Sequence, residues 1–216
     1  MNKLIILKNV TISFVKIYQP VPKMSGNGNE FSLQVIMPKD HPQIGELAGA
    51  INAIKEEAFP NMQIPKDCLL VRDSDAEGKG QQFDYMENTV FFNVRRNENQ
   101  GAVPCADNQG KSFVPNPQII FSGCICNVHI SLYDYAVRNQ QGQVMKRGVT
   151  GSLNGVQLVD NVNVQRLGGG APVPQFEAVE GNVNMAVTDP SMMPAQDEAL
   201  PEAPAAAKAE APEVPW

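Results

Sequence analysis

The run of residues 117–136, PQIIFSGCICNVHISLYDYA, most constrains the fold, because it is the longest stretch of strand-like composition in the chain. Successive side chains of a strand point to opposite faces. One face carries mainly small and apolar side chains: Ser122, Cys124, Cys126, Val128, Ile130 and Leu132. The other face carries Phe121, Ile125, Asn127, His129, Ser131 and Tyr133. We expect a long strand, kinked at Gly123, that forms the centre of an antiparallel barrel and offers Phe121, His129 and Tyr133 to a ligand.

Shorter segments of β-rich composition lie on both sides of this run. Residues 10–18 and 30–37 alternate, and we expect them to form a hairpin across residues 19–29, a connection rich in proline and glycine. Residues 68–72, 89–96 and 144–159 supply three further strands, and Gly142 is predicted to centre the hairpin that leads into the last of them. This order is typical of a small, mainly β (α+β) barrel.

One helix is expected, after the second strand. Asp40 is predicted to cap its first turn, with Gln43 completing a capping box and Pro42 tolerated at the start. Pro60 ends the helix. Apolar side chains recur between these limits at spacings of three and four: Ile44, Leu47, Ala48, Ile51 and Ile54. We expect this apolar stripe to plug one end of the barrel.

Charge is distributed unevenly along the 216 residues. Residues 1–176 contain 16 lysines and arginines against 15 aspartates and glutamates, whereas residues 177–216 contain 1 against 8, for a net charge of −6. The C-terminal part is rich in Gly, Pro, Ala and Glu and has too little apolar surface to offset its ordering entropy. We therefore predict a folded domain over residues 1–168 and a disordered acidic tail over residues 169–216. The near-neutral domain can still gather its cations on one face.

The sequence predicts neither a signal peptide nor a membrane-spanning helix. No run of 18 apolar residues exists, and polar residues enter the N-terminal segment too early for a signal peptide. The four cysteines are then better explained as reduced, buried thiols than as a disulfide framework. These features predict a cytoplasmic protein without a membrane partner.

The segment of residues 89–96 has the composition of a nucleic-acid-binding strand. Phe91, Asn93 and Arg95 share one face, opposite an apolar face, which combines a ring for base stacking with a cation for a phosphate. An ordinary sheet surface is the competing interpretation. Five further cations lie in connections and in a hairpin that could rim the same side of the barrel: Lys23, Lys79, Arg138, Lys146 and Arg147.

Other chemistries have weaker support. Cys105, Cys124, Cys126 and His129 lack the turn-borne spacing of a structural zinc site. Asp73, Asp75, Glu77 and Asp84 imitate a calcium loop without flanking helices or a final glutamate, so a solvated turn is the better explanation. Neither histidine has an evident nucleophile or base beside it. We expect no catalytic residue, no metal and no cofactor.

The C-terminal end has two interpretations. The acidic segment ends in an aromatic residue, with Glu213 and Trp216 in the final four positions. Such a segment can act as an internal mimic of a polyanion that covers the cationic face until nucleic acid displaces it. Trp216 would then anchor a partner protein. A tail that only improves solubility is the alternative.

Taken in order, the stretches VTISFVKIYQP, EFSLQVIMPKD, LLVRDSD, VFFNVRR, FSGCICNVHISLYDYA and GVTGSLNGVQLV make the chain resemble phage-encoded single-stranded-DNA-binding proteins of the OB-fold type. The acidic tail with its terminal aromatic is similar to the tails of the same class. The resemblance implies an OB barrel, often a homodimer, that coats ssDNA in replication or recombination in the host cytoplasm, while the tail recruits phage or host replication proteins. The helix position and the long loop of residues 73–88 depart from most OB barrels.

The sequence therefore predicts a non-enzymatic protein that binds ssDNA by stacking and phosphate contacts. Phe121 and Tyr133 join Phe91, Asn93, Arg95 and the five cations as predicted contacts. A phage structural or assembly β-protein that binds no nucleic acid is the main alternative. A metal-dependent nuclease that uses Asp73, Asp75 and Glu77 is a more distant one.

Overall fold

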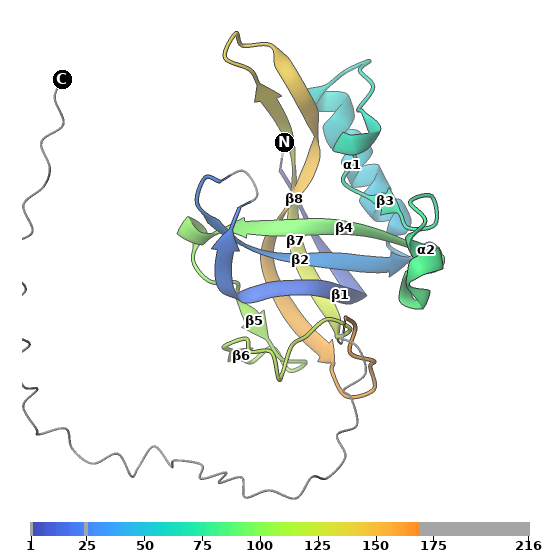
Figure 1. Cartoon of the computed structure of the whole chain (residues 1–216), viewed down its shortest axis with the longest axis vertical. Coiled ribbons are helices and arrows are strands. Elements are labelled where there is room, and N and C mark those ends of the chain that lie inside the picture. Colours follow the sequence, from blue (N-terminus) through green and yellow to red (C-terminus); the bar gives the residue numbers. More distant parts are fainter. Residues whose placement is uncertain (1, 24–25, 169–216) are drawn as a thin grey trace, which may run out of the picture. The chain divides into compact units, whose positions relative to one another are not determined.

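The computed structural model of the chain describes residues 2–23 and 26–168. Five long strands form a closed barrel: β1 (Lys3–Pro22), β2 (Asn29–Pro38), β4 (Thr89–Asn97), β7 (Ile125–Arg138) and β8 (Val144–Asp160) (Figure 1). Neighbouring strands pair antiparallel in the order β4-β2-β1-β7-β8. A parallel bridge between Arg95 and Ser152 closes the barrel from β4 to β8. The predicted OB-like barrel is confirmed, with this one parallel contact added to the antiparallel pairs.

Shorter helices and strands lie in the connections between the barrel strands. α1 (Ile44–Ala58) follows β2, and η1 (Lys66–Cys68), β3 (Arg72–Asp73), α2 (Lys79–Gln82) and η2 (Asp84–Met86) lie between α1 and β4. η3 (Glu98–Gln100), β5 (Cys105–Ala106) and β6 (Ser112–Phe113) connect β4 to β7. The strand predicted over residues 68–72 is wrong in extent, because only Arg72 joins β3, which pairs with β4 at Phe91 and Val90.

The inner face of β7 matches the alternation predicted for residues 117–136. Cys126, Val128, Ile130 and Leu132 are fully buried in the barrel core. All four cysteines are free and buried, as predicted, and burial raises the pKa of Cys105 to about 11. The strand itself is shorter than predicted, since it begins at Ile125 rather than near Pro117.

Two bulges in β1 change the predicted alternation of residues 10–18. Asn9 and Phe14 have positive φ values of 53° and 47°, and the pairing register shifts beside each of them. Val10, Ile12 and Ile17 are all buried although Ile17 has the opposite parity, while Phe14 is 62% exposed. Phe14 therefore does not share the face of Val10 and Ile12, as simple alternation predicts, because an extra residue in a bulge moves the following side chains to the other face.

The helix begins later than predicted. Gln43, not Asp40, is the N-cap residue of α1, and no side chain caps the helix. The Gln43 amide instead donates to the Ile6 carbonyl and accepts from the Lys8 backbone N–H, which ties the start of α1 to β1. Leu47, Ala50 and Ile54 are its buried side chains. Ala50 thus replaces the predicted Ala48, which is exposed.

Gly123 lies in the turn before β7 rather than at a kink within the strand. Its φ is 111°, its N–H donates to the Ile12 carbonyl, and a Cβ would overlap the Gln165 carbonyl oxygen. We expect Gly123→Ala to lower the free energy of unfolding by about 1–3 kcal/mol, because backbone strain adds to this overlap. Urea unfolding measures the loss. Gly110→Ala, with a positive φ but open space around the Cβ, is the control and should cost less; equal losses would contradict the role of the overlap.

Candidate nucleic-acid interface

A groove of about 840 Å³ lies on the outer surface where β4, β7 and β8 meet. Most of the groove is formed by side chains that point away from the barrel core, since the neighbouring residues in each strand, which lie on the opposite face, are buried. Residues of the segment 67–72 and Lys23, from the connection between β1 and β2, complete its walls. The groove thus combines the outer face of the sheet with two connecting segments.

Uncharged hydrogen-bonding groups make up much of the groove surface. Its amide and aliphatic hydroxyl side chains are Asn2, Asn93, Asn97, Gln100, Ser131, Thr150, Ser152 and Asn154. Asn154 donates to the Ser131 hydroxyl at 2.7 Å, which links β8 to β7. Such groups can donate to or accept from nucleobases and phosphates without adding charge.

Two tyrosines lie in the groove, both on the outer face of β7. Tyr133 is 37% exposed, and Tyr135, two residues along the strand, is half-buried. Burial, together with the neighbouring Cys68, raises the pKa of Tyr135 to about 12, so this phenol is uncharged at neutral pH. Uncharged rings are suitable surfaces for stacking bases.

Three cations line the groove: Lys23, Arg72 and Arg95. Two acids line it as well, and each lies near a cation. Glu30 is 3.6 Å from the Arg95 guanidinium, and Asp67 is 3.5 Å from the Lys146 ammonium of the β7–β8 hairpin. Arg72 is 3.4 Å from Glu77, outside the groove. The groove is therefore only mildly basic.

The structure contradicts the predicted stacking role of Phe91. Its ring is fully buried, in a small cluster with Ile36 and Met86 outside the barrel core. Two cations also cover the ring, with Arg72 at 4.6 Å and Lys79 at 3.9 Å from its centroid. Phe91 does share the outer face with Asn93 and Arg95, but the segment of residues 73–88 folds over it. Lys79 thus contacts Phe91 instead of lining the groove.

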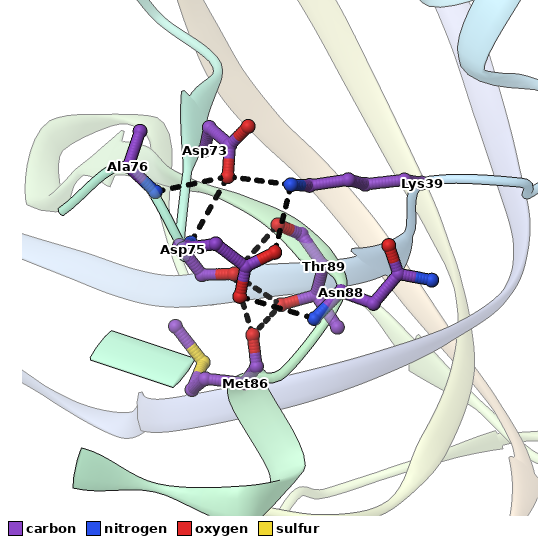
Figure 2. Close-up of polar contacts among 8 residues, drawn as sticks. Lys39, Asp73, Asp75, Ala76, Met86, Asn88 and Thr89 are labelled. Carbon is purple, nitrogen blue, oxygen red and sulfur yellow. Dashed lines mark hydrogen bonds and ion pairs between the residues drawn. The ribbon is translucent and has the colours of Figure 1, made fainter. Parts of the chain in front are cut away.

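Polar contacts fix this covering segment (Figure 2). The Lys39 ammonium is 2.8 Å from carboxylate oxygens of both Asp73 and Asp75. These contacts raise the pKa of Lys39, and the bond to Lys39 is the main cause of the lowered pKa of Asp73. The buried Ser74 hydroxyl is 2.6 Å from the Thr89 carbonyl oxygen.

The carboxylates of Asp73 and Asp75, which imitate calcium ligands in the sequence, thus stabilise the turn in which they lie. Asp73 accepts from the backbone N–H groups of Asp75 and Ala76, and Asp75 accepts from that of Asn88. Within residues 2–23 and 26–168 no group of three or more His, Cys, Asp or Glu side chains is placed to hold a metal ion. The same residues contain no helix long and apolar enough to cross a membrane.

The remaining predicted contacts divide between the groove and other surfaces. Lys23, Asn93, Arg95 and Tyr133 are brought together in the groove. Phe121 lies elsewhere, where the Arg166 guanidinium stacks on its ring at 3.9 Å. Arg138, Lys146 and Arg147 belong to the β7–β8 hairpin, whose end projects beyond the barrel on the side of α1 (Figure 1). Glu213 and Trp216 lie outside the described residues.

Sequence reasoning missed two prominent groove residues, Arg72 and Tyr135. Alternation could have found Tyr135, because it lies two residues after Tyr133 on the same strand. No local pattern points to Arg72. It reaches the groove because β3 pairs with β4 and because its guanidinium stacks on Phe91.

Comparison with known proteins identifies the family of the chain. The family model described as the ssDNA-binding protein of Enterobacter phage Enc34 matches residues 3–184. The chain belongs to this family. No curated protein sequence matches it significantly.

Solved structures agree with the family in fold. The Enc34 protein in complex with ssDNA has 17% sequence identity and a TM-score of 0.58, with 74% of this chain and 88% of that chain covered. The ssDNA-binding protein gp2.5 of bacteriophage T7 has 16% identity and a TM-score of 0.52, with 84% and 100% covered. The Enc34 family and gp2.5 therefore share the barrel described here.

Proposed function

We propose that the chain binds single-stranded DNA in the groove formed by β4, β7 and β8, with little sequence preference and without catalysis. The observation that carries the proposal is the meeting of tyrosine rings, cations and uncharged polar groups in one groove. Stacking on Tyr133 and Tyr135 requires bases whose faces are free, which a duplex does not offer. Family membership and the Enc34 complex with ssDNA support the same ligand.

The position of the groove in the barrel supports this use. In OB folds, oligonucleotides bind across the face of the second and third strands, between the loop that joins the first two strands and the loop that joins the last two. The second and third barrel strands here are β2 and β4, of which Glu30 and the outer face of β4 line the groove. The corresponding loops are the β1–β2 connection, with Lys23, and the β7–β8 hairpin, with Arg138, Lys146 and Arg147. We propose that these cations contact phosphates at the two sides of the groove.

We propose the wider role from the family of phage ssDNA-binding proteins to which the chain belongs and from the acidic composition of residues 177–216. The protein protects ssDNA during phage DNA replication or recombination in the host cytoplasm, as a homodimer. Its acidic C-terminal tail competes with DNA for the cations and recruits replication or recombination proteins through Glu213 and Trp216.

Titration of a fluorescently labelled oligonucleotide with the full-length protein tests the proposal. Single strands should bind tightly and duplexes weakly, and each phosphate contact should add about 0.7 to the slope of log affinity against log salt. Deletion of residues 177–216 should tighten binding. Failure of single strands of varied sequence to bind at low salt would refute the proposal and favour the structural or assembly protein.

A further inference from the structure

Glu30 is an acidic side chain in a groove that we assign to an anionic ligand, and the proposed function gives it no task. It lines the groove beside Lys23 and Arg95. We propose that Glu30 limits the affinity of the groove for ssDNA, by holding Arg95 in an ion pair that a phosphate has to displace. This inference rests on the proposed function and adds to it a residue that regulates binding strength.

The position of Glu30 is set by the sheet. It is the second residue of β2 and pairs with Val21 of β1 and with Asn97 of β4. The next residue, Phe31, is buried in the core, so Glu30 points outward into the groove. Two residues further on, Ser32 pairs with Arg95, which brings the guanidinium next to the Glu30 carboxylate.

The two partners of the ion pair differ in their access to solvent. The Glu30 side chain is 12% exposed, whereas the Arg95 side chain is 53% exposed, and 3.6 Å separates Arg95 Nη1 from Glu30 Oε1. Water therefore screens the carboxylate poorly, while the guanidinium remains accessible from the groove. A phosphate that approaches Arg95 meets both the attraction of the guanidinium and the repulsion of a nearby carboxylate.

This competition lowers affinity without removing the binding site. Arginine binds carboxylates and phosphates with the same charged group, so the Glu30 carboxylate, 3.6 Å from Arg95 Nη1, competes with a phosphate for the guanidinium. Binding of DNA then replaces one ion pair by another, and only the difference between them contributes to affinity. A protein that coats DNA transiently gains a faster release from such an internal competitor.

The second acid of the groove provides a comparison within the same protein. Asp67 is 3.5 Å from Lys146, but both side chains are well exposed, at 64% and 60%. Solvent and salt screen an exposed pair strongly. The inference therefore assigns the larger effect to Glu30, and Asp67→Asn should change affinity less than Glu30→Gln.

The test measures ssDNA affinity of full-length variants at about 50 mM and about 200 mM salt. Glu30→Gln should tighten binding roughly three- to tenfold at the lower salt. It should also steepen the salt slope, by at most roughly 0.7, because no carboxylate is freed that would take up a cation when the phosphate binds Arg95. Glu57→Gln, on the exposed side of α1, makes the same charge change outside the groove and controls for net charge. Glu30→Ser removes the carboxylate with a smaller side chain and should give the same gain if Glu30→Gln folds poorly.

The outcomes separate this inference from the proposed function. Unchanged or weaker binding by folded Glu30 variants would overturn the inference, because it would make Glu30 neutral or a positioning residue for Arg95. A gain equal to that of Glu57→Gln would overturn it as well. In an Arg95→Ala background the gain should shrink, and a full gain there would show that Glu30 does not act through Arg95. Absence of ssDNA binding by the wild type would overturn the proposed function itself.

Discussion

Replacing Phe91 by alanine will lower the free energy of unfolding by about 3–5 kcal/mol, the usual cost of removing a fully buried aromatic side chain. The ring fills the space between β4 and the covering segment of residues 73–88, where it contacts Ile36 and Met86 and supports Arg72 and Lys79. A loss of this size is a large part of the stability of a typical domain. Urea and thermal unfolding of the wild type and the variant measure it.

Phe91→Leu separates packing from stacking on DNA. Leucine keeps most of the apolar contact and should cost about 1–2 kcal/mol. The leucine variant lacks the aromatic ring. If Phe91 stacked on a base, its loss would lower ssDNA affinity strongly; because Phe91 is buried, we expect an affinity within roughly threefold of the wild type. Phe83→Ala, at an exposed ring outside the groove, is the control and should cost little stability. A well-folded Phe91→Leu that no longer binds DNA would contradict this account.

Replacing Arg95 and Tyr133 together by alanine will weaken ssDNA binding by roughly 100-fold, because stacking contributes about 1–3 kcal/mol per base and the lost phosphate contact adds to it. Both side chains are exposed in the groove, and Arg95 pairs with Ser152 where the barrel closes. The Arg95 change alone should also reduce the salt slope, whereas the Tyr133 change should leave the slope nearly unchanged. Fluorescence anisotropy with a labelled oligonucleotide at several salt concentrations measures both quantities.

Matched variants outside the groove test whether the loss is local. Lys111→Ala removes an exposed cation from the turn between β5 and β6, and Phe83→Ala removes an exposed ring. Both should bind within about twofold of the wild type. A loss in the Lys111 and Phe83 variants similar to that of Arg95→Ala with Tyr133→Ala would place the DNA elsewhere. Thermal unfolding confirms that each variant is folded.

Local chemistry was enough to predict the five barrel strands and the buried face of β7. The alternation along β7 identified Cys126, Val128, Ile130 and Leu132 as core residues, and the same alternation put Asn93, Arg95 and Tyr133 on outer faces. Alternation failed in β1, because the bulge at Phe14 has no signal in the sequence and reverses the faces beyond it. Propensity also placed the helix correctly after β2 but not its first residue, which is fixed by the contact of Gln43 with β1.

The sequence by itself determined the barrel strands, the helix and the set of outward-facing residues that could form a binding surface. It could do so because the direction of a side chain in a strand depends on its immediate neighbours. Only the tertiary structure decided which outer faces stay open. Residues 73–88 fold over Phe91 and are held by Lys39, so a ring with the right parity is buried, while Arg72 is carried into the groove. Exposure depends on segments distant in the sequence, and periodicity does not encode where they pack.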